Sequence, residues 1–452
     1  MRPNRSKASK SGILLRVKEG RVPLHVKILI GLVLGGVAGV AARQVLGGSD
    51  PNLKWFIDNL AKPVGDVFLG LLFMIVVPLV FSALVMGMQE LGKAKKFGRV
   101  GGLSLALTLA LSLIACTIAI VGVNLIKPGA SISAEQRTLL MEKYQDKEKA
   151  AKAVETAKKG LEDPPVLGII PKNPFKEINR ALEGGLMPLM FFALVFGAAL
   201  AGTDDEKARP LRDFFESLFE VSQRVIGYAM KLAPYAVFFL VFKSLAELGV
   251  ELLRPMAIYV VTVLGLLALH LFGVYSLAIA FIAKRNPLQF FRQMRTTMLT
   301  AFATSSSNAT LPTALHAAEE EVGLRKEVSN FVLTVGATAN QNGTALYEGV
   351  TILFLAQLFA HDLSVAEQIR VLLLTVVASI GTAGIPSASL PFIATVLVSV
   401  GIQPEAMGLI LGIDRILDMS RTVLNVTGDM TIAACVDRLS GGPVVHPEEA
   451  YA

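Results

Sequence analysis

The chain has 452 residues, of which 53% are hydrophobic and only 17% are charged, and its formal net charge is +7. A soluble globular domain carries about 25% charged residues, so this composition argues against a soluble protein and indicates the lipid bilayer. The two cysteines, Cys116 and Cys435, both lie in apolar surroundings, which excludes a disulfide framework and a cysteine metal cluster. The five histidines are scattered and show no metal-ligand spacing.

The hydrophobic residues occur in long blocks that are nearly free of charge. Several blocks reach or approach the roughly 20 residues that a membrane-spanning helix needs. They lie at 27–41, 67–88, 103–126, 187–201, 227–247, 256–283, 350–360 and 390–402. The pattern predicts an all-α polytopic membrane protein.

The basic residues indicate the orientation of the chain in the membrane. Seven Lys or Arg residues lie in the first 21 positions, without a cleavage site for a signal peptide, so we expect an uncleaved cytoplasmic tail. Counting spans from that tail places residues 92–99, the loop 203–213 and residues 284–295 on the same side. A chain of this class is not expected to bind nucleic acid.

Residues 131–164 interrupt the hydrophobic pattern. The segment is highly charged, favours a helix and ends at Pro164-Pro165. The span count places it outside the cytoplasm, where long loops escape the charge rule. We interpret it as a solvated insert.

Three polar runs interrupt the hydrophobic blocks of the second half. They are "TAFATSSSNATLP" (300–312), "GATANQNGTALYEG" (336–349) and "ASIGTAGIPSAS" (378–389). Irregular backbone at membrane depth is tolerated only where it is buried in protein or lines a cavity, and such segments form binding sites in secondary transporters. Surface loops between short helices are the alternative interpretation.

The segment "DRILDMSRTVLNVTGD" (414–429) places charged side chains in a hydrophobic stretch. At about 100° per residue, its polar side chains share an arc of roughly 100°, with Arg415 at the edge. The stripe consists of Asp414, Asp418, Arg421, Thr422, Asn425 and Asp429.

A charge at the bilayer centre is costly, so this stripe must face the protein interior and find partners there. The planar fork of Arg421 suits a carboxylate, and Asp418, one turn away, suits an ammonium group. The two side chains could hold an acidic amino acid by both ends. The alternative is a salt bridge between Asp418 and Arg421 that closes on itself.

These motifs resemble the glutamate transporter family, the dicarboxylate/amino acid:cation symporters, over about residues 24–440 apart from the insert. The run "TSSSNATLP" resembles the tip of the family's first re-entrant hairpin, and "NQNGTALYEG" resembles its NMDGT motif in a broken seventh helix. The run "SIGTAGIPSAS" resembles the second hairpin tip, and 414–429 resembles the eighth helix.

The resemblance implies eight transmembrane helices and two re-entrant helical hairpins, assembled as a homotrimer with elevator-type alternating access. It divides the chain into a scaffold and a moving transport domain. The implied segments are a basic cytoplasmic tail (1–23), scaffold helices 1–2 (24–97), transport-domain helix 3 (98–127), the extracytoplasmic insert or loop (128–185), scaffold helices 4–5 (186–250), the rest of the transport domain (251–440) and a C-terminal tail (441–452).

The resemblance also implies a set of binding residues, with Arg421 for the substrate side-chain carboxylate and Asp418 for its amino group. The other implied substrate-binding residues are Thr422, Asn425, Thr344, Ser306, Ser307, Gly384 and Ile385. The implied cation ligands are Gly336, Asn340, Asn425 and Asp429 at one site, and Thr338, Ser379, Ile380 and Thr382 at a second, with Gln341 in the same motif. Oxygen-only ligation suits a hard cation such as sodium.

This sequence departs from the family pattern at several positions. Asn342 replaces the NMDGT aspartate and Leu111 replaces a third-helix partner, so we do not expect a third sodium site. The arginine that other members carry in the first hairpin or eighth helix corresponds here to Ser305 or Met419. Arg415 is a candidate to compensate. Two hairpin glycines are replaced by Ser387 and Ser389, a change that we expect to alter gate packing.

The function that follows is secondary symport of aspartate or glutamate, coupled to sodium, protons or both, in the cell inner (plasma) membrane with both termini cytoplasmic. No organic cofactor is expected. Glu348 matches a glutamate that carries a proton in animal members, and its alternative is a locally paired carboxylate without a transport role. Alternative functions are C4-dicarboxylate symport, a passive anion channel and, as an enzyme, an intramembrane hydrolase.

Overall fold

The computed structural model describes residues 24–48, 50–96, 98–132, 138, 140, 170–179, 186–361, 363–381, 389–399 and 404–441. These residues are mostly helical and include no strand, which confirms the predicted all-α class. The N-terminal tail, most of the insert and most of the C-terminal tail lie outside the described residues.

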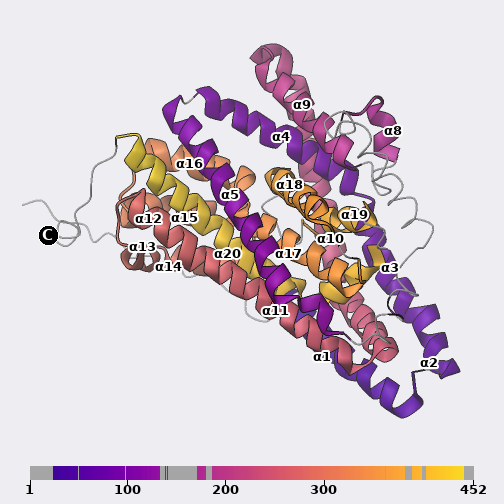
Figure 1. The fold of residues 1–452 in the computed structure, drawn as a ribbon. Coiled ribbons are helices and arrows are strands. Elements are labelled where there is room, and N and C mark those ends of the chain that lie inside the picture. The colour runs from indigo at the N-terminus through magenta and orange to yellow at the C-terminus, as the bar shows by residue number, and fades with distance from the viewer. Residues whose placement is uncertain are drawn as a thin grey trace, which may run out of the picture.

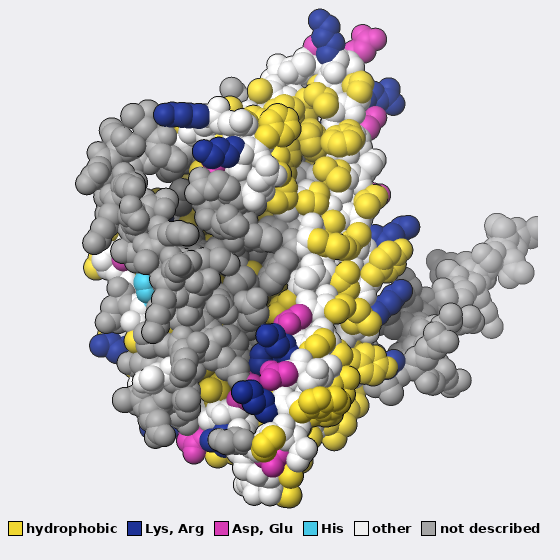
Figure 2. All heavy atoms as spheres, turned by 90° about the vertical axis from the view of Figure 1, so that its right-hand side faces the viewer, with side chains coloured by type: hydrophobic (Ala, Val, Ile, Leu, Met, Phe, Trp, Pro, Cys, Tyr) yellow, Lys and Arg dark blue, Asp and Glu magenta, His cyan; other side chains and the backbone are white. Residues whose placement is uncertain are grey.

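Five helical stretches of the described chain are long and apolar enough to cross a membrane. They are Val26–Leu46, Pro51–Gln89, Arg99–Ser131, Asp205–Leu248 and Val250–Phe281, and Pro188–Gly202 is a shorter apolar helix. Figure 2 shows a face on which hydrophobic side chains form a broad band with scattered charged side chains among them. An exposed apolar surface of this extent suits contact with lipid or with another subunit.

The described residues of the first half of the chain form α-helices and short 3-10 and π turns. Its helices are α1 (Leu24–Leu46), α2 (Pro51–Phe56), η1 (Ile57–Ala61), α3 (Lys62–Phe73), α4 (Val76–Lys96), α5 (Arg99–Ile126), η2 (Pro128–Ser131), α8 (Pro174–Asn179), α9 (Leu186–Gly202) and α10 (Asp205–Leu248). Helix α4 packs against α9 and α10, and α10 contacts α1, α3 and α20.

Glycines allow α1 to approach α10 very closely. A Cβ atom on Gly31 or Gly35 would collide with the backbone carbonyls of Pro234 and Phe238. Small residues at such a spacing let helix backbones meet in a membrane, where the hydrophobic effect does not drive helices together. The sequence "GLVLGGVAG" therefore fixes α1 against α10.

The start of α10 differs from the prediction. Residues 203–213 were expected to form a loop, but the helix begins at Asp205 and continues for 44 residues. Asp204 caps it by accepting a hydrogen bond from the Glu206 amide, and acidic residues occupy the first turn. Both features stabilise a helix N-terminus and outweigh the loop-like composition.

The second half of the chain surrounds the charged helix α20. Its helices are η4 (Val250–Leu252), α11 (Leu253–Ala268), η5 (Leu269–Val274), α12 (Tyr275–Phe281), α13 (Pro287–Gln293), α14 (Arg295–Thr304), α15 (Ser307–His316), η6 (Ala317–Glu321), α16 (Lys326–Ala339), α17 (Asn342–Leu358), α18 (Val365–Gly381), α19 (Leu390–Ser399), η7 (Pro404–Met407) and α20 (Gly408–Leu439). Figure 1 shows α20 in the middle of the molecule, and it contacts α5, α10, α11, α14, α16 and α17.

Two of the three polar runs coincide with breaks between helices, as predicted. Helices α14 and α15 pack against each other and join at Ser305, whose backbone is left-handed with φ of 51°. Helices α16 and α17 are separated by Asn340 and Gln341. The third run continues from α18 into residues 382–388, which lie outside the described part of the chain.

Candidate substrate and cation site

The predicted polar stripe of α20 is buried. Helices from both halves of the chain cover α20, and each side chain of the stripe is 4% exposed or less. The stripe comprises Asp414, Asp418, Arg421, Thr422, Asn425 and Asp429. The sequence-based expectation that it faces the protein interior is confirmed.

Asp418 and Arg421 bind each other in this structure. The Nε and Nη2 atoms of Arg421 donate to Asp418 Oδ1 at 2.9 and 2.6 Å. Arg415 Nη1 donates to the other oxygen, Asp418 Oδ2, at 3.2 Å. The self-closing salt bridge, which the sequence left open as an alternative, is therefore formed, and neither group stands free to meet a ligand in this arrangement.

Two further side chains hold Arg421, and the sequence did not identify either as its partner. Its Nη1 donates to the hydroxyl of Ser389, immediately before α19. Its guanidinium carbon lies 4.9 Å from the ring centroid of Tyr347 on α17, a cation–π contact. The Tyr347 hydroxyl donates in turn to Asp414 Oδ1 at 2.7 Å.

Asn425 connects α20 to the first turn of α17. Its Oδ1 accepts hydrogen bonds from the backbone amides of Gly343 and Thr344 at 2.7 and 3.3 Å. Its Nδ2 donates to Gln341 Oε1 at 2.5 Å and to the Thr344 hydroxyl at 3.2 Å. The first amides of a helix have no partner within the helix, so a side chain from α20 caps α17. Three predicted site residues thus meet at the helix break.

The break between α14 and α15 is buried. Ser306 caps α15 by accepting a hydrogen bond from the Ala309 amide at 3.2 Å. The Ser307 hydroxyl is buried and has no hydrogen-bond partner among the described residues. Gly384 and Ile385, which the resemblance implies as substrate-binding residues, lie outside the described residues. The Thr422 hydroxyl donates to the Asp418 carbonyl within α20, so it is already used in this structure.

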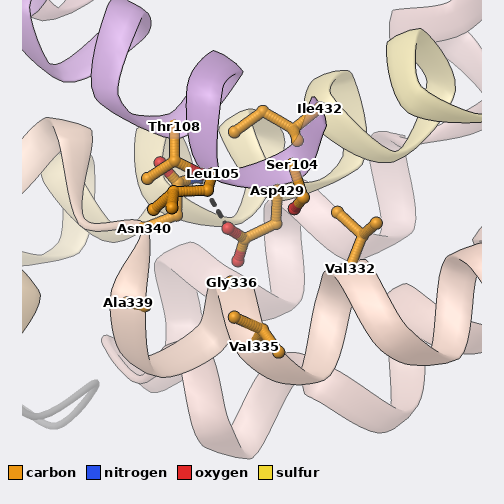
Figure 3. Close-up of a pocket in the computed structure, with 10 residues that line it drawn as sticks. All are labelled: Ser104, Leu105, Thr108, Val332, Val335, Gly336, Ala339, Asn340, Asp429 and Ile432. Carbon is orange, nitrogen blue, oxygen red and sulfur yellow. Dashed lines mark hydrogen bonds between the residues drawn. The ribbon is translucent and has the colours of Figure 1, made fainter. Parts of the chain in front are cut away.

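Asp429 lies in a small pocket whose lining combines a few polar groups with apolar side chains, shown in Figure 3. Asn340 Nδ2 donates to Asp429 Oδ1 at 2.7 Å, whereas Asn340 Oδ1 is buried without a hydrogen-bond partner in the described structure. The pocket is also lined by Gly336 and, from α5, by Ser104 and Thr108. A Cβ at Gly336 would collide with the Asp429 carboxylate.

This donor set fits a hard cation because it offers a carboxylate and, on the neighbouring Asn340 side chain, an unused amide oxygen. Three of the four residues predicted for the first cation site, Gly336, Asn340 and Asp429, come together here. The Asn425 side chain points to the start of α17 instead. Its backbone carbonyl lies about one helical turn before Asp429.

The residues predicted for a second cation site are only partly described. Thr338 and Ser379 lie on α16 and α18, which contact each other. Their hydroxyls donate within their own helices, to the carbonyls of Val335 and Val376. Ile380 lies in α18, and Thr382 is outside the described residues.

Asn342 forms a hydrogen-bonded bridge between helices. Its Oδ1 accepts from the Ser112 hydroxyl on α5 at 2.5 Å, and its Nδ2 donates to the Tyr275 hydroxyl at 3.2 Å. Tyr275 donates to the Leu424 carbonyl of α20 at 3.3 Å. A neutral amide with two partners thus occupies the position where the family resemblance implies a carboxylate.

Glu348 follows Tyr347 on α17 and is completely buried. Neither of its carboxylate oxygens has a hydrogen-bond partner among the described residues. Among the described contacts, no hydrogen bond supports the alternative of a locally paired carboxylate. An ionised carboxylate is costly in such surroundings, and a bound proton removes that cost.

Together, the fold and the site define a helical membrane protein that encloses charged side chains around a helix break. The family model of the sodium:dicarboxylate symporter family matches residues 24–439. The chain therefore belongs to the sodium:dicarboxylate symporter family. This is a family of transporters, which excludes the intramembrane-hydrolase alternative.

Curated relatives are similar over nearly their whole length. The chain is 31% identical to the proton/sodium-glutamate symport protein of Bacillus caldotenax, covering 93% of this chain and 95% of that protein. It is 32% identical to the proton/glutamate-aspartate symporter of Escherichia coli K12, covering 91% and 92%. It is 31% identical to excitatory amino acid transporter 3 of the rabbit, Oryctolagus cuniculus, covering 92% and 85%.

Proposed function

We propose that the chain is a secondary symporter that carries aspartate or glutamate across the membrane together with cations. The family membership and the names of the relatives, which are glutamate and aspartate symporters, support cation-coupled transport of acidic amino acids. The observation that carries the substrate assignment is the buried Asp418–Arg421 ion pair beside the break between α16 and α17.

When an acidic amino acid binds, two new ion pairs with the substrate replace this one. Its side-chain carboxylate takes the fork of Arg421, and its ammonium group takes Asp418. Breaking a buried pair by removing one partner is strongly destabilising, whereas an exchange leaves each charge paired. A ligand that carries both charges therefore has an advantage over one that carries neither. Asn425, Thr344 and the hairpin residues Ser306, Ser307, Gly384 and Ile385 complete the pocket in this proposal.

Sodium is the cargo of the Asp429 pocket in this proposal, held by carboxylate and amide oxygens from α16 and α20. Its positive charge offsets a buried carboxylate for which the described contacts provide no cationic partner. A third sodium site at Asn342 is not part of the proposal because that amide is neutral and already bonded to Ser112 and Tyr275.

Glu348 provides a route for proton coupling. Protonation neutralises its buried carboxyl, and exposure to water on either side of the membrane allows the proton to exchange. The bacterial relatives are named as symporters that use protons. In this proposal Glu348 carries a proton in addition to, or in place of, one sodium ion.

The proposal also includes the detailed architecture that the family resemblance implies. It comprises eight transmembrane helices and two hairpins, with residues 24–97 and 186–250 as scaffold and 98–127 and 251–440 as a transport domain. The transport domain moves as an elevator within a homotrimer in the plasma membrane, with both termini in the cytoplasm. The close packing of α1 on α10 supports a rigid scaffold, and the apolar face in Figure 2 supports burial in lipid or between subunits.

Uptake of radiolabelled aspartate into proteoliposomes tests the function. Sodium, proton and potassium gradients are imposed one at a time. We expect accumulation above the external concentration when sodium or protons flow inward, and its loss in Asp418→Asn and Arg421→Gln. Equilibration without accumulation under every gradient would instead support the passive-channel alternative.

A further inference from the structure

Residues 282–295 join α12 to α14 through the short helix α13, and we call this segment the basic elbow. Figure 1 shows α12, α13 and α14 together at one end of the molecule. The basic elbow carries Lys284, Arg285, Arg292 and Arg295, whereas residues 252–318 contain no aspartate or glutamate. Positive charge therefore gathers on this segment without acidic neighbours in the same stretch of chain.

Three of the four cations in the basic elbow are available to an external partner. Arg285 is half-buried, and its Nη1 donates to the Val322 carbonyl at 2.6 Å. Lys284, Arg292 and Arg295 are exposed, and none of the three forms an ion pair with another described residue. These three side chains are the ones that an anionic group outside the protein would meet.

The exposed face of α14 changes from charged to apolar along the helix. Arg295, Leu299 and Phe302 are spaced by four and then three residues, so they share one face. Leu299 is 68% exposed and Phe302 is 40% exposed, whereas Thr297 and Ala301 on the other face are buried. A cation followed by exposed apolar side chains is expected of a helix that passes from the lipid headgroups into the hydrocarbon.

Helices α12 and α13 show the same combination on the other side of the basic elbow. Leu277 and Phe281, one turn apart on α12, are 58% and 67% exposed, and Lys284 follows them. On α13, Leu288 is 80% exposed and lies one turn before Arg292. Exposed cations beside exposed apolar side chains are typical of segments that lie at the surface of an anionic bilayer.

We propose that the basic elbow is a binding site for an anionic phospholipid of the cytoplasmic leaflet. Lys284, Arg292 and Arg295 bind the phosphate and the anionic headgroup, and the acyl chains lie on the apolar faces of α12 and α14. Charge complementarity favours a lipid over a second copy of this face, which would place cations against cations. The cytoplasmic placement of residues 284–295 rests on the proposed function, but lipid binding itself requires no transport.

The basic elbow is attached to the helices of the candidate substrate and cation site. Gln293 Nε2 donates to the Glu321 carbonyl of η6 at 2.5 Å, and α14 packs against α20. A lipid bound at the basic elbow consequently contacts the same packed group of helices that carries the buried polar stripe. Its headgroup fixes the depth of that group in the bilayer.

Titration of phosphatidylglycerol into the delipidated protein, followed by native mass spectrometry, tests the site. Phosphatidylcholine with the same acyl chains and no net charge is titrated in parallel. The test variant combines Lys284→Gln, Arg292→Gln and Arg295→Gln. A cation near an anionic lipid surface contributes a factor of about five to binding. We expect the variant to lose one tightly bound phosphatidylglycerol per chain, with its Kd raised at least about tenfold, and to bind phosphatidylcholine within about twofold of the wild type.

The matched control combines Lys207→Gln, Arg209→Gln and Arg212→Gln at the start of α10. It removes the same number of positive charges, and the span count places it on the same side of the membrane. Acidic residues already pair with two of these cations, because Asp213 lies 3.8 Å from Arg209 and Asp205 lies 3.4 Å from Arg212. We expect this control to bind phosphatidylglycerol within about twofold of the wild type.

Three outcomes would overturn the proposal. One is unchanged phosphatidylglycerol binding in the basic-elbow variant, and another is an equal loss in the control, which indicates a general effect of net charge. The third is a change in subunit assembly with unchanged lipid binding, which would assign this face to a contact between chains. If the triple variant does not fold, as judged by thermal unfolding, Arg292→Gln and Arg295→Gln alone decide, each with an expected loss of about fivefold. Absence of aspartate uptake by the wild type would contradict the proposed function and leave the lipid result unaffected.

Discussion

Arg421 and Asp418 lie three residues apart on α20 and are joined at 2.6 Å in a region where both side chains are almost completely buried. The pair neutralises two charges, each of which would be costly if buried alone in the hydrocarbon core of the bilayer. In the proposed function, a substrate that binds here must exchange its own charges for those of the pair. Affinity then depends on every contact that holds the two side chains in their present positions.

Ser389 is one of those contacts, and its removal should strengthen substrate binding. Its hydroxyl accepts a hydrogen bond from Arg421 Nη1, which must break when Arg421 turns to a ligand. A hydrogen bond to a charged group is worth about 1.5–3 kcal/mol, so Ser389→Ala should lower the Kd for aspartate by a factor of about 10 to 150. Isothermal titration calorimetry on the purified protein measures the change.

Ser420→Ala is the matched control for Ser389→Ala. The Ser420 hydroxyl donates only to the Ile416 carbonyl within α20 among the described contacts, so its loss should leave the aspartate Kd within about twofold. Weaker binding in Ser389→Ala would show instead that this hydroxyl contacts the substrate.

Asp429 should set the sodium dependence of transport. Asp429→Asn keeps the shape of the side chain but removes the charge that faces Asn340. Cation affinity depends on the number of charged ligands, so the sodium concentration for half-maximal uptake should rise at least about tenfold. Uptake rates measured over a sodium series provide the test. Asp213→Asn, which removes the charge of an exposed aspartate on α10 outside the pocket, is the control and should shift the midpoint less than about twofold.

Glu348 should be the origin of the pH dependence of aspartate uptake. Because its buried carboxyl binds a proton during transport in this account, aspartate uptake should increase as the external pH falls. Glu348→Gln mimics the neutral form and should transport with little dependence on pH. Uptake at several external pH values and a fixed sodium gradient measures this. Glu367→Gln, at a partly exposed glutamate of α18, should keep the wild-type profile. An unchanged profile in Glu348→Gln would remove the proton-carrier role.

Gly343 fixes the start of α17 against α20. A Cβ at this position would overlap the Arg421 carbonyl and crowd the Asn425 side chain. Overpacking of a buried site costs about 1–3 kcal/mol, so Gly343→Ala should lower the melting temperature in detergent by several degrees. The control is Gly265→Ala on α11, where a Cβ has open space and a helix-favouring residue should not destabilise. Equal melting temperatures would contradict the close packing of α17 on α20.

The sequence predicted features that depend on local pattern. The arc of polar residues from Asp414 to Asp429 indicated a buried face because unpaired charges are excluded from lipid, and the structure buries that face. The runs around Ser305 and Asn340 predicted breaks between helices, and the chain breaks there. Each of these predictions could be made from the residues of a single segment.

Contacts between segments that are far apart in the sequence were harder to predict from the sequence. The sequence flagged Ser389 as a departure from the family but could not show that it binds Arg421, 32 residues away. Tyr347 was visible in the run "TALYEG", and its burial beside Arg421 depends on how α17 packs against α20. The extension of α10 to Asp205 was missed because the composition of 203–213 resembles a loop, although Asp204 is a favourable helix cap.

The most direct test of this account is an experimentally determined structure of the protein with aspartate bound. The account predicts that the 2.6 Å contact between Arg421 Nη2 and Asp418 Oδ1 is broken, with the side-chain carboxylate of aspartate on Arg421 and its ammonium group on Asp418 Oδ1. An aspartate bound elsewhere, with the Asp418–Arg421 pair intact, would contradict it.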